Sequence, residues 1–353
     1  MSRLIAFSLC GAFAGVALLD SARAATSEPA SPVPLDAAGM ADAIEATVGR
    51  VFHENADAVV RVESEDELGK VAGTGFFADM NGTIYTLTSV VGDGLSVMVT
   101  HAGQRWPARL LTKDSRSGIA LIKIETPTAT PFLTRGDSGE LKAASPLIAI
   151  GFPFDHDVTP SFGLVGGFDR QSAGRFFATT HIRANIPVQR GQGGSPVLNM
   201  DGKAVGILVS SFEEGAGCYV LPMRAAEKLR SDYERFGGVR HGWAGVTVQE
   251  VPQAVNGSRI AIDVVDPSGP AVGEFRPGDV VLQVGDITVR EPEDALDAAF
   301  FLTAGDSIQV KVARGDEILN ISFTPGQHPM ERSNDLQALG PDRLMNVVPA
   351  TTP

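Results

Sequence analysis

A glycine-rich stretch near the middle of the chain has the composition of a site that binds a negatively charged oxygen. Residues 190–195 read Arg-Gly-Gln-Gly-Gly-Ser and run directly into the apolar segment 196–198. Glycine allows the backbone to bend sharply and to present its N–H groups at one point. A phosphate loop would need a following Lys-Ser/Thr and a helix, and both are missing here. The stretch therefore predicts an oxyanion site, in which backbone N–H groups bind a carbonyl or carboxylate oxygen.

This loop resembles the nucleophile loop of trypsin-like serine proteases of the HtrA (DegP) type. In that family Arg-Gly-Asn-Ser-Gly-Gly precedes an Asn-x-x-Gly turn, and here the turn is Asn199 to Gly202. Residues 73–77, Gly-Thr-Gly-Phe-Phe, and residues 151–154, Gly-Phe-Pro-Phe, resemble two further family segments in the same order. The resemblance extends from about residue 40 to 323. It implies a mainly β fold, a trypsin-like double β-barrel followed by one PDZ domain.

The resemblance places all three catalytic positions on residues that cannot carry out the catalytic steps. Ser89 occupies the histidine position, Gly118 the aspartate position and Gly193 the position of the nucleophilic serine. Peptide hydrolysis needs a nucleophile, an imidazole that takes its proton and a carboxylate that orients the imidazole. We therefore expect negligible peptidase activity. The resemblance leaves Gly191 and Gly193 as a remnant oxyanion hole that binds a peptide or anion, or alternatively a relaxed turn that binds nothing.

Two other residue sets are candidates for unorthodox chemistry. Ser195 is the nearest hydroxyl but matches a small structural residue of the family pattern, and the sequence 155–157, Asp-His-Asp, is a weak metal signal that we interpret as a surface turn. We expect no metal and no cofactor. An active serine endopeptidase built from Ser195 and a loop histidine remains the alternative. Six histidines lie beyond the N-terminal apolar run: His53, His101, His156, His181, His241 and His328.

The C-terminal part of the chain resembles a PDZ domain. The resemblance is carried by residues 276–281, Arg-Pro-Gly-Asp-Val-Val, and 285–289, Gly-Asp-Ile-Thr-Val. Ala244, Gly245 and Val246 match the carboxylate-binding loop, whose N–H groups cap a peptide C-terminus while the peptide adds as a strand beside a helix. The alternative is a domain used only for packing within the chain.

The elements expected around these motifs are mostly short strands, which favour barrels or sandwiches over a βαβ fold. Apolar spacing predicts helices at 40–52, 223–236 and 292–302. The predicted strands are 58–62, 73–78, 83–88, 95–100, 106–111, 119–124, 147–151, 161–168, 176–184, 195–199, 204–210 and 217–222, with 307–313 and 317–323 in the PDZ part.

The N-terminus has the charged, apolar and small-residue order of a secretory signal, and we expect cleavage after Ala24. This predicts an exported, periplasmic protein. Cys218 is then the sole cysteine of the mature chain, and its apolar neighbours predict a buried thiol. The expected segments are a signal peptide at 1–24, a flexible leader at 25–38, the trypsin-like domain at 39–236, the PDZ domain at 239–327 and a loosely ordered tail at 328–353.

The composition and charge of the chain limit the classes of partner that it is expected to bind. The chain has 353 residues, 43% of them hydrophobic, and a formal charge of −13 without a basic cluster, which argues against nucleic acid and anionic membrane surfaces. We expect polypeptide C-termini or unfolded proteins as ligands. The resemblance also implies a homotrimer or association with an active HtrA relative, and no membrane span once the signal is removed. A purely structural component of an envelope assembly is the third alternative.

Overall fold

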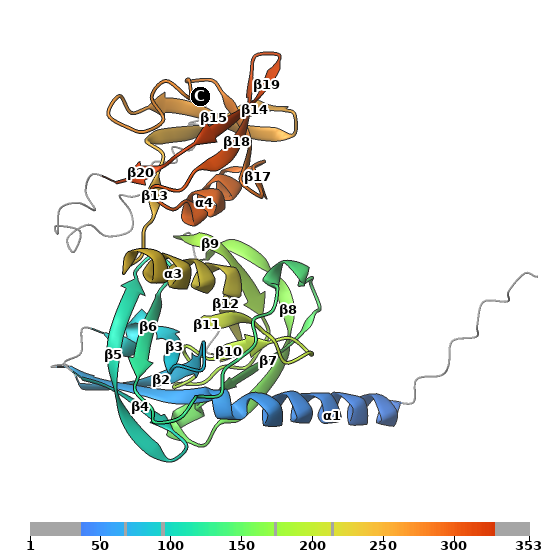
Figure 1. Ribbon diagram of the computed structural model, residues 1–353. Helices are drawn as coiled ribbons and strands as arrows, with labels where there is room; N and C mark the ends of the chain where they lie inside the picture. Colours follow the sequence, from blue (N-terminus) through green and yellow to red (C-terminus); the bar gives the residue numbers. More distant parts are fainter. Residues whose placement is uncertain (1–36, 67–68, 93–95, 173–174, 213–214, 329–353) are drawn as a thin grey trace, which may run out of the picture. The chain divides into compact units, whose positions relative to one another are not determined.

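The computed structural model describes residues 37–66, 69–92, 96–172, 175–212 and 215–328 (Figure 1). Residues 43–353 form one compact unit, separate from residues 1–42. The predicted signal peptide and the tail beyond His328 lie outside the described residues. The predicted leader at 25–38 lies there too, except for its last two residues, which already belong to the first helix.

Six antiparallel strands close the first barrel, as expected for a trypsin-like fold. Apolar runs such as Ile84 to Leu87 and Ile119 to Ile122 are buried on both sides, because one face fills the barrel and the other meets its neighbour. The strands, in their order around the barrel, are β1 Val59–Asp66, β2 Gly69–Phe77, β3 Thr83–Leu87, β6 Ile119–Ile124, β5 Gln104–Asp114 and β4 Ser96–His101.

A second closed barrel of six strands follows in the chain. Its interior is a separate apolar cluster that contains Leu147, Val165, Val205 and Cys218, so the thiol is buried as predicted. The two barrels confirm the mainly β, trypsin-like prediction. The strands, in their order around the barrel, are β10 Pro196–Leu198, β11 Ala204–Phe212, β12 Gly217–Pro222, β9 Arg175–Ala184, β8 Thr159–Ser172 and β7 Pro146–Gly151.

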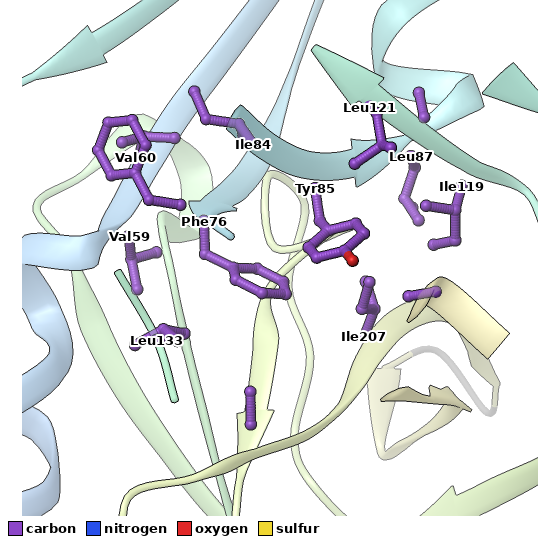
Figure 2. Packing of buried hydrophobic residues seen from close by; sticks show 14 of the residues in the cluster. Val59, Val60, Phe76, Ile84, Tyr85, Leu87, Ile119, Leu121, Leu133 and Ile207 are labelled. Atoms are coloured by element: carbon purple, nitrogen blue, oxygen red, sulfur yellow. The ribbon is translucent and has the colours of Figure 1, made fainter. Parts of the chain in front are cut away.

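One apolar core joins the two barrels. Figure 2 shows Phe76 and Tyr85 of the first barrel packed with Ile207 of the second, and the two rings lie 5.5 Å apart. The Tyr85 hydroxyl donates a hydrogen bond to Glu227 at 3.0 Å, which links this core to helix α3, Met223–Phe236. Burial of the ring and the nearby Glu227 carboxylate raise the pKa of Tyr85 well above its usual value.

The first helix is longer than predicted. Helix α1 spans Ala37–Asn55, whereas the apolar spacing indicates residues 40–52. Val51 is fully buried against the barrels, but Met40 and Ile44 are 47% and 45% exposed, so only the C-terminal half of the apolar stripe is covered. A short helix, α2 Thr88–Val91, was not predicted and follows β3 directly. Three turns of 3-10 helix occupy Ala56–Ala58, Ser138–Glu140 and Pro153–Asp155.

The C-terminal part forms a separate sheet with one helix packed against it. Helix α4, Pro292–Phe301, has Pro in its first turn, and Asp294 accepts the backbone N–H of Glu291 at 3.1 Å, which fixes the start of the helix. The sheet contains β14 Val246–Val255, β15 Ser258–Val265, β16 Val280–Val284, β18 Ile308–Arg314 and β19 Glu317–Phe323, with β17 Ile287–Thr288 paired to β16 and a separate pair β13 Gly242–Trp243 and β20 Gly326–Gln327.

Polar contacts hold helix α4 against the second barrel. The buried Asp297 accepts the backbone N–H of Thr180 at 2.9 Å and the hydroxyl of Thr179 from strand β9. Arg224 of α3 pairs with the same carboxylate at 2.7 Å and stacks on Phe301. These contacts satisfy the buried charge of Asp297.

Among the described residues, no helix is long and apolar enough to cross a membrane.

Candidate functional site

The structure brings two of the three catalytic positions of the resemblance, Ser89 and Gly193, into one open cleft between the barrels, and the third, Gly118, is hydrogen-bonded to the residue before Ser89. The N–H of Thr88, next to Ser89, donates to the carbonyl of Gly118 at 2.8 Å. A Cβ atom placed on Gly193 would lie 3.2 Å from a methyl carbon of Leu87. Ser89 and Gly193 both line the cleft.

Among its described residues, the lining of this cleft contains no group that can act as a general base. These residues include no His, Asp, Glu or Cys, and Arg190 is their one ionisable side chain. Hydroxyls are present on Ser89, Ser210 and Ser211. A serine hydroxyl attacks a peptide only after a neighbouring base removes its proton, and the described lining supplies none.

The histidines of the chain are used elsewhere. None of them is among the described lining residues of the cleft, and five make contacts with aromatic rings outside that lining. Burial lowers the pKa values of His101 and His181. The contacts are His53 with Phe52, His101 with Phe77, His181 with Phe177, His241 with Phe300 and His328 with Trp243.

Ser195 is placed where it cannot meet a substrate. The residue is 0% exposed, and its hydroxyl lies against Gly151, where an added Cβ would approach the oxygen to 2.1 Å. The sequence alternative of a nucleophilic Ser195 therefore lacks both access and a base. His156, from the weak metal signal, is exposed, and no three His, Cys, Asp or Glu side chains gather into a metal site within the described ranges.

The glycine loop is fixed by hydrogen bonds to its neighbours and leaves two of its described N–H groups without an acceptor. Thr74 fixes the loop through two hydrogen bonds. Its N–H donates to the carbonyl of Gly193 and its hydroxyl donates to the carbonyl of Gly191, each at 2.8 Å. Gly194 donates to Leu208 at 2.9 Å, and both Gly191 and Gly194 have positive φ angles, 93° and 88°. No acceptor among the described residues takes the N–H groups of Gly191 and Gly193. These two donors can bind a carbonyl or carboxylate oxygen.

A second candidate site is an apolar pocket of about 380 Å³ in the C-terminal domain. One wall is helix α4, where Ala295 and Ala299 present small side chains, and the opposite wall is strand β14 with Val246 and Val248. The floor is formed by larger apolar residues: Ile262, Phe275, Val281, Val289, Val310 and Phe323.

The predicted carboxylate-binding loop lies beside this pocket. Gly245 has a φ of 74°, and its carbonyl accepts the N–H of Asp266 at 2.8 Å, which fixes the turn. In the described part of the chain the N–H groups of Ala244 and Gly245 have no acceptor. Val246 is already paired with Val265 in the sheet and contributes its side chain to the pocket. The arrangement suits a peptide C-terminus, with its carboxylate on the loop and its last side chain in the pocket.

Sequence reasoning missed one buried contact and one lining residue of this pocket. Asp114 accepts a hydrogen bond from Nε2 of the buried His241 at 2.9 Å, and Arg116 of the same turn lines the pocket. Asp114 is 127 positions from His241 in the chain. No local pattern signals such a contact.

Comparisons with known proteins agree with both domains. Residues 73–207 match the trypsin-like peptidase domain family, and residues 230–324 match the PDZ domain family. Both domains, in this order, are similar to those of HtrA/DegP-type proteins.

Similar HtrA/DegP-type proteins are named proteases. A "Probable periplasmic serine endoprotease DegP-like" from Halomonas elongata is 29% identical over 284 residues, covering 76% of this chain and 59% of that protein. A protein of the same description from Chlamydia pneumoniae is 29% identical over 297 residues, covering 80% and 60%. The chain thus spans about three-fifths of the length of these relatives.

Solved structures show the same fold. The structure "HtrA-type protease AlgW with tripeptide" aligns with a TM-score of 0.67 at 21% identity, covering 80% of this chain and 97% of that one. A serine endoprotease from Yersinia pestis aligns with a TM-score of 0.59 at 22% identity, covering 80% and 98%.

Proposed function

We propose that this protein is an HtrA-like pseudoprotease that binds polypeptides without cleaving them. The site supports this proposal, because Ser89, Gly118 and Gly193 supply no nucleophile with a base and the described lining of the cleft offers no substitute. In subtilisin, removal of the whole triad lowers turnover by about 10⁶-fold. By the resemblance, this chain also lacks the whole triad, so we expect a comparable loss of turnover.

The proposed ligand of the PDZ pocket is a polypeptide C-terminus with an apolar last residue. The unpartnered N–H groups of Ala244 and Gly245 match a carboxylate, and the apolar pocket matches the side chain beside it. The remnant oxyanion hole of Gly191 and Gly193 offers a second, weaker site for a backbone carbonyl of an unfolded chain.

The location and the partners are also proposals. The N-terminal signal pattern and the periplasmic description of the relatives support an exported, periplasmic protein. Association as a homotrimer, or with an active HtrA relative, is proposed from the family alone.

The decisive test uses the purified chain from Ala25 onward with fluorescent casein and a fluorophosphonate probe. We expect neither cleavage nor labelling, under conditions in which an active HtrA-type protease shows both. A Gly193→Ser variant should also stay inactive, because the new hydroxyl would have no base. Cleavage by the wild-type chain that disappears in a Ser195→Ala variant would establish the unorthodox endopeptidase instead.

A further inference from the structure

We propose that Arg116, a residue of the trypsin-like domain, binds the terminal carboxylate of the peptide in the PDZ pocket. This inference rests on the proposed peptide-binding function of that pocket. Arg116 lies in the turn that follows strand β5 and precedes Gly118, the position of the lost catalytic aspartate. In this chain, the turn supplies part of the PDZ ligand site.

The first observation is the position of Arg116. Its half-buried side chain lines the same pocket as Gly242, Trp243 and Ala244, which lead into the carboxylate-binding loop. A residue from outside the PDZ fold therefore forms part of the pocket lining. A guanidinium at the mouth of an apolar pocket presents several N–H donors in a planar fork that fits a carboxylate.

The second observation is that the turn is fixed to the loop by a buried carboxylate. Asp114 accepts the backbone N–H groups of Arg116 and Ser117, each at 3.1 Å, so it orders the turn from within. The same carboxylate accepts Nε2 of His241 at 2.9 Å, and both side chains are buried. His241 immediately precedes Gly242 at the start of β13. One buried group thus positions both the arginine and the strand that leads to the loop.

The third observation is the charge around the pocket. Its described lining contains no Asp or Glu, whereas Arg116 and His328 are its two residues that can carry positive charge. The N–H groups of Ala244 and Gly245 add partial positive charge on the same side. An apolar pocket with donors and cations gathered at one end fits an apolar group that carries an anion, and a peptide C-terminus has this chemistry.

The test measures binding of two fluorescein-labelled peptides by fluorescence anisotropy, using the chain from Ala25 onward. Both peptides end in Ser-Gly-Ser-Ala-Val-Leu, one with a free carboxylate and one with a C-terminal amide. We expect the wild type to prefer the carboxylate form. Arg116→Gln should weaken binding of that form about 10-fold, as for loss of a charge-assisted hydrogen bond, and leave the amide form unchanged.

The matched control is Arg109→Gln, which removes the same charge from an exposed position on strand β5 outside the pocket lining. It should bind both peptides as the wild type does. Arg116→Lys should recover part of the carboxylate preference, because a lysine retains the charge but lacks the fork. Equal melting temperatures would show that all variants are folded.

The outcomes separate this inference from the proposed function. If the wild type prefers the carboxylate form and Arg116→Gln keeps the full preference, Arg116 is not a ligand although the pocket binds C-termini. If Arg116→Gln weakens both peptides equally, the residue only supports the fold, and the inference fails again. If the wild type binds neither peptide, or binds both alike, the proposed capture of C-termini fails and this inference fails with it.

Discussion

Nε2 of His241 donates a hydrogen bond to Oδ1 of Asp114 at 2.9 Å, and this contact joins a turn of the first barrel to the residue before β13. Burial by itself would raise the pKa of Asp114. The hydrogen bond and charge of His241, with donors from Ser117 and Arg116, outweigh burial and lower the pKa to about 2. The carboxylate is therefore ionised in the native protein at any physiological pH.

This lowered pKa predicts acid sensitivity. Because the folded pKa of Asp114, about 2, lies below the reference value of 3.8, its ionised form stabilises the native state above about pH 4, and this contribution is lost as the pH falls towards 2. The contribution is about 2 kcal/mol. Urea unfolding between pH 2 and pH 6 should show this loss in the wild type and a flatter profile in Asp114→Asn.

The control for this experiment is Asp316→Asn, at an exposed turn after Arg314. It should keep the wild-type pH profile. If Asp114→Asn loses as much free energy of unfolding between pH 4 and pH 2 as the wild type, the carboxylate is not the group responsible.

Gly118 and Gly193, at two of the catalytic positions that the resemblance implies, differ in how readily their backbone conformation accepts a side chain. Gly118 has a φ of 74° with open space around it, whereas Gly193 lies outside the left-handed region and has only Leu87 nearby. Gly118→Ala should therefore lower the free energy of unfolding by about 1 kcal/mol through backbone strain alone. Gly193→Ala should change it by less than about 0.5 kcal/mol. Chemical denaturation of both variants measures the difference, and equal costs would contradict the assigned conformations.

The local sequence pattern was sufficient to predict most strands of the two barrels and the helix that follows them. Helix α3 begins and ends at the predicted residues 223 and 236, because its apolar spacing is regular and Gly237 ends it in a left-handed conformation. The hairpin of β8 and β9 is longer than predicted, since β8 continues through the polar residues 169–172, which pair with β9 without apolar alternation. Periodicity has no signal for such a ribbon.

The two candidate sites differed in how far sequence could define them. Gly191 and Gly245 lie at turns whose positive φ angles restrict the residue type, and Gly193 was found from its place in the same glycine-rich loop. Arg116 and His241 were not found, because their roles depend on how a turn of one domain lies against a strand of another. The exposure of Met40 and Ile44 could not be predicted for the same reason, since spacing gives the face of a helix but not what covers it.

Cys218 is expected to be chemically silent in the folded protein. Its side chain is fully buried in the second barrel, and burial raises the pKa of the thiol to about 12. At pH 8 the native chain should therefore not react with Ellman's reagent over an hour, and should release one equivalent of chromophore after denaturation in guanidinium. The chain from Ala25 onward has no other cysteine, so rapid reaction of this chain in its native state would show that the core opens.

The carboxylate-binding loop allows the sharpest test of the PDZ site. Gly245 has a φ of 74°, and an added Cβ would lie 2.8 Å from the Cα of Gly269, so Gly245→Ala must displace the backbone that presents the N–H groups. Gly257 is the matched control, because its φ of 86° imposes similar strain with no atom within 4 Å. We expect both variants to lose about 1 kcal/mol of stability, but only Gly245→Ala to lose binding of the carboxylate peptide, by at least about 10-fold. Anisotropy titrations of the two variants measure this difference, and equal binding by both would exclude the loop as the carboxylate site.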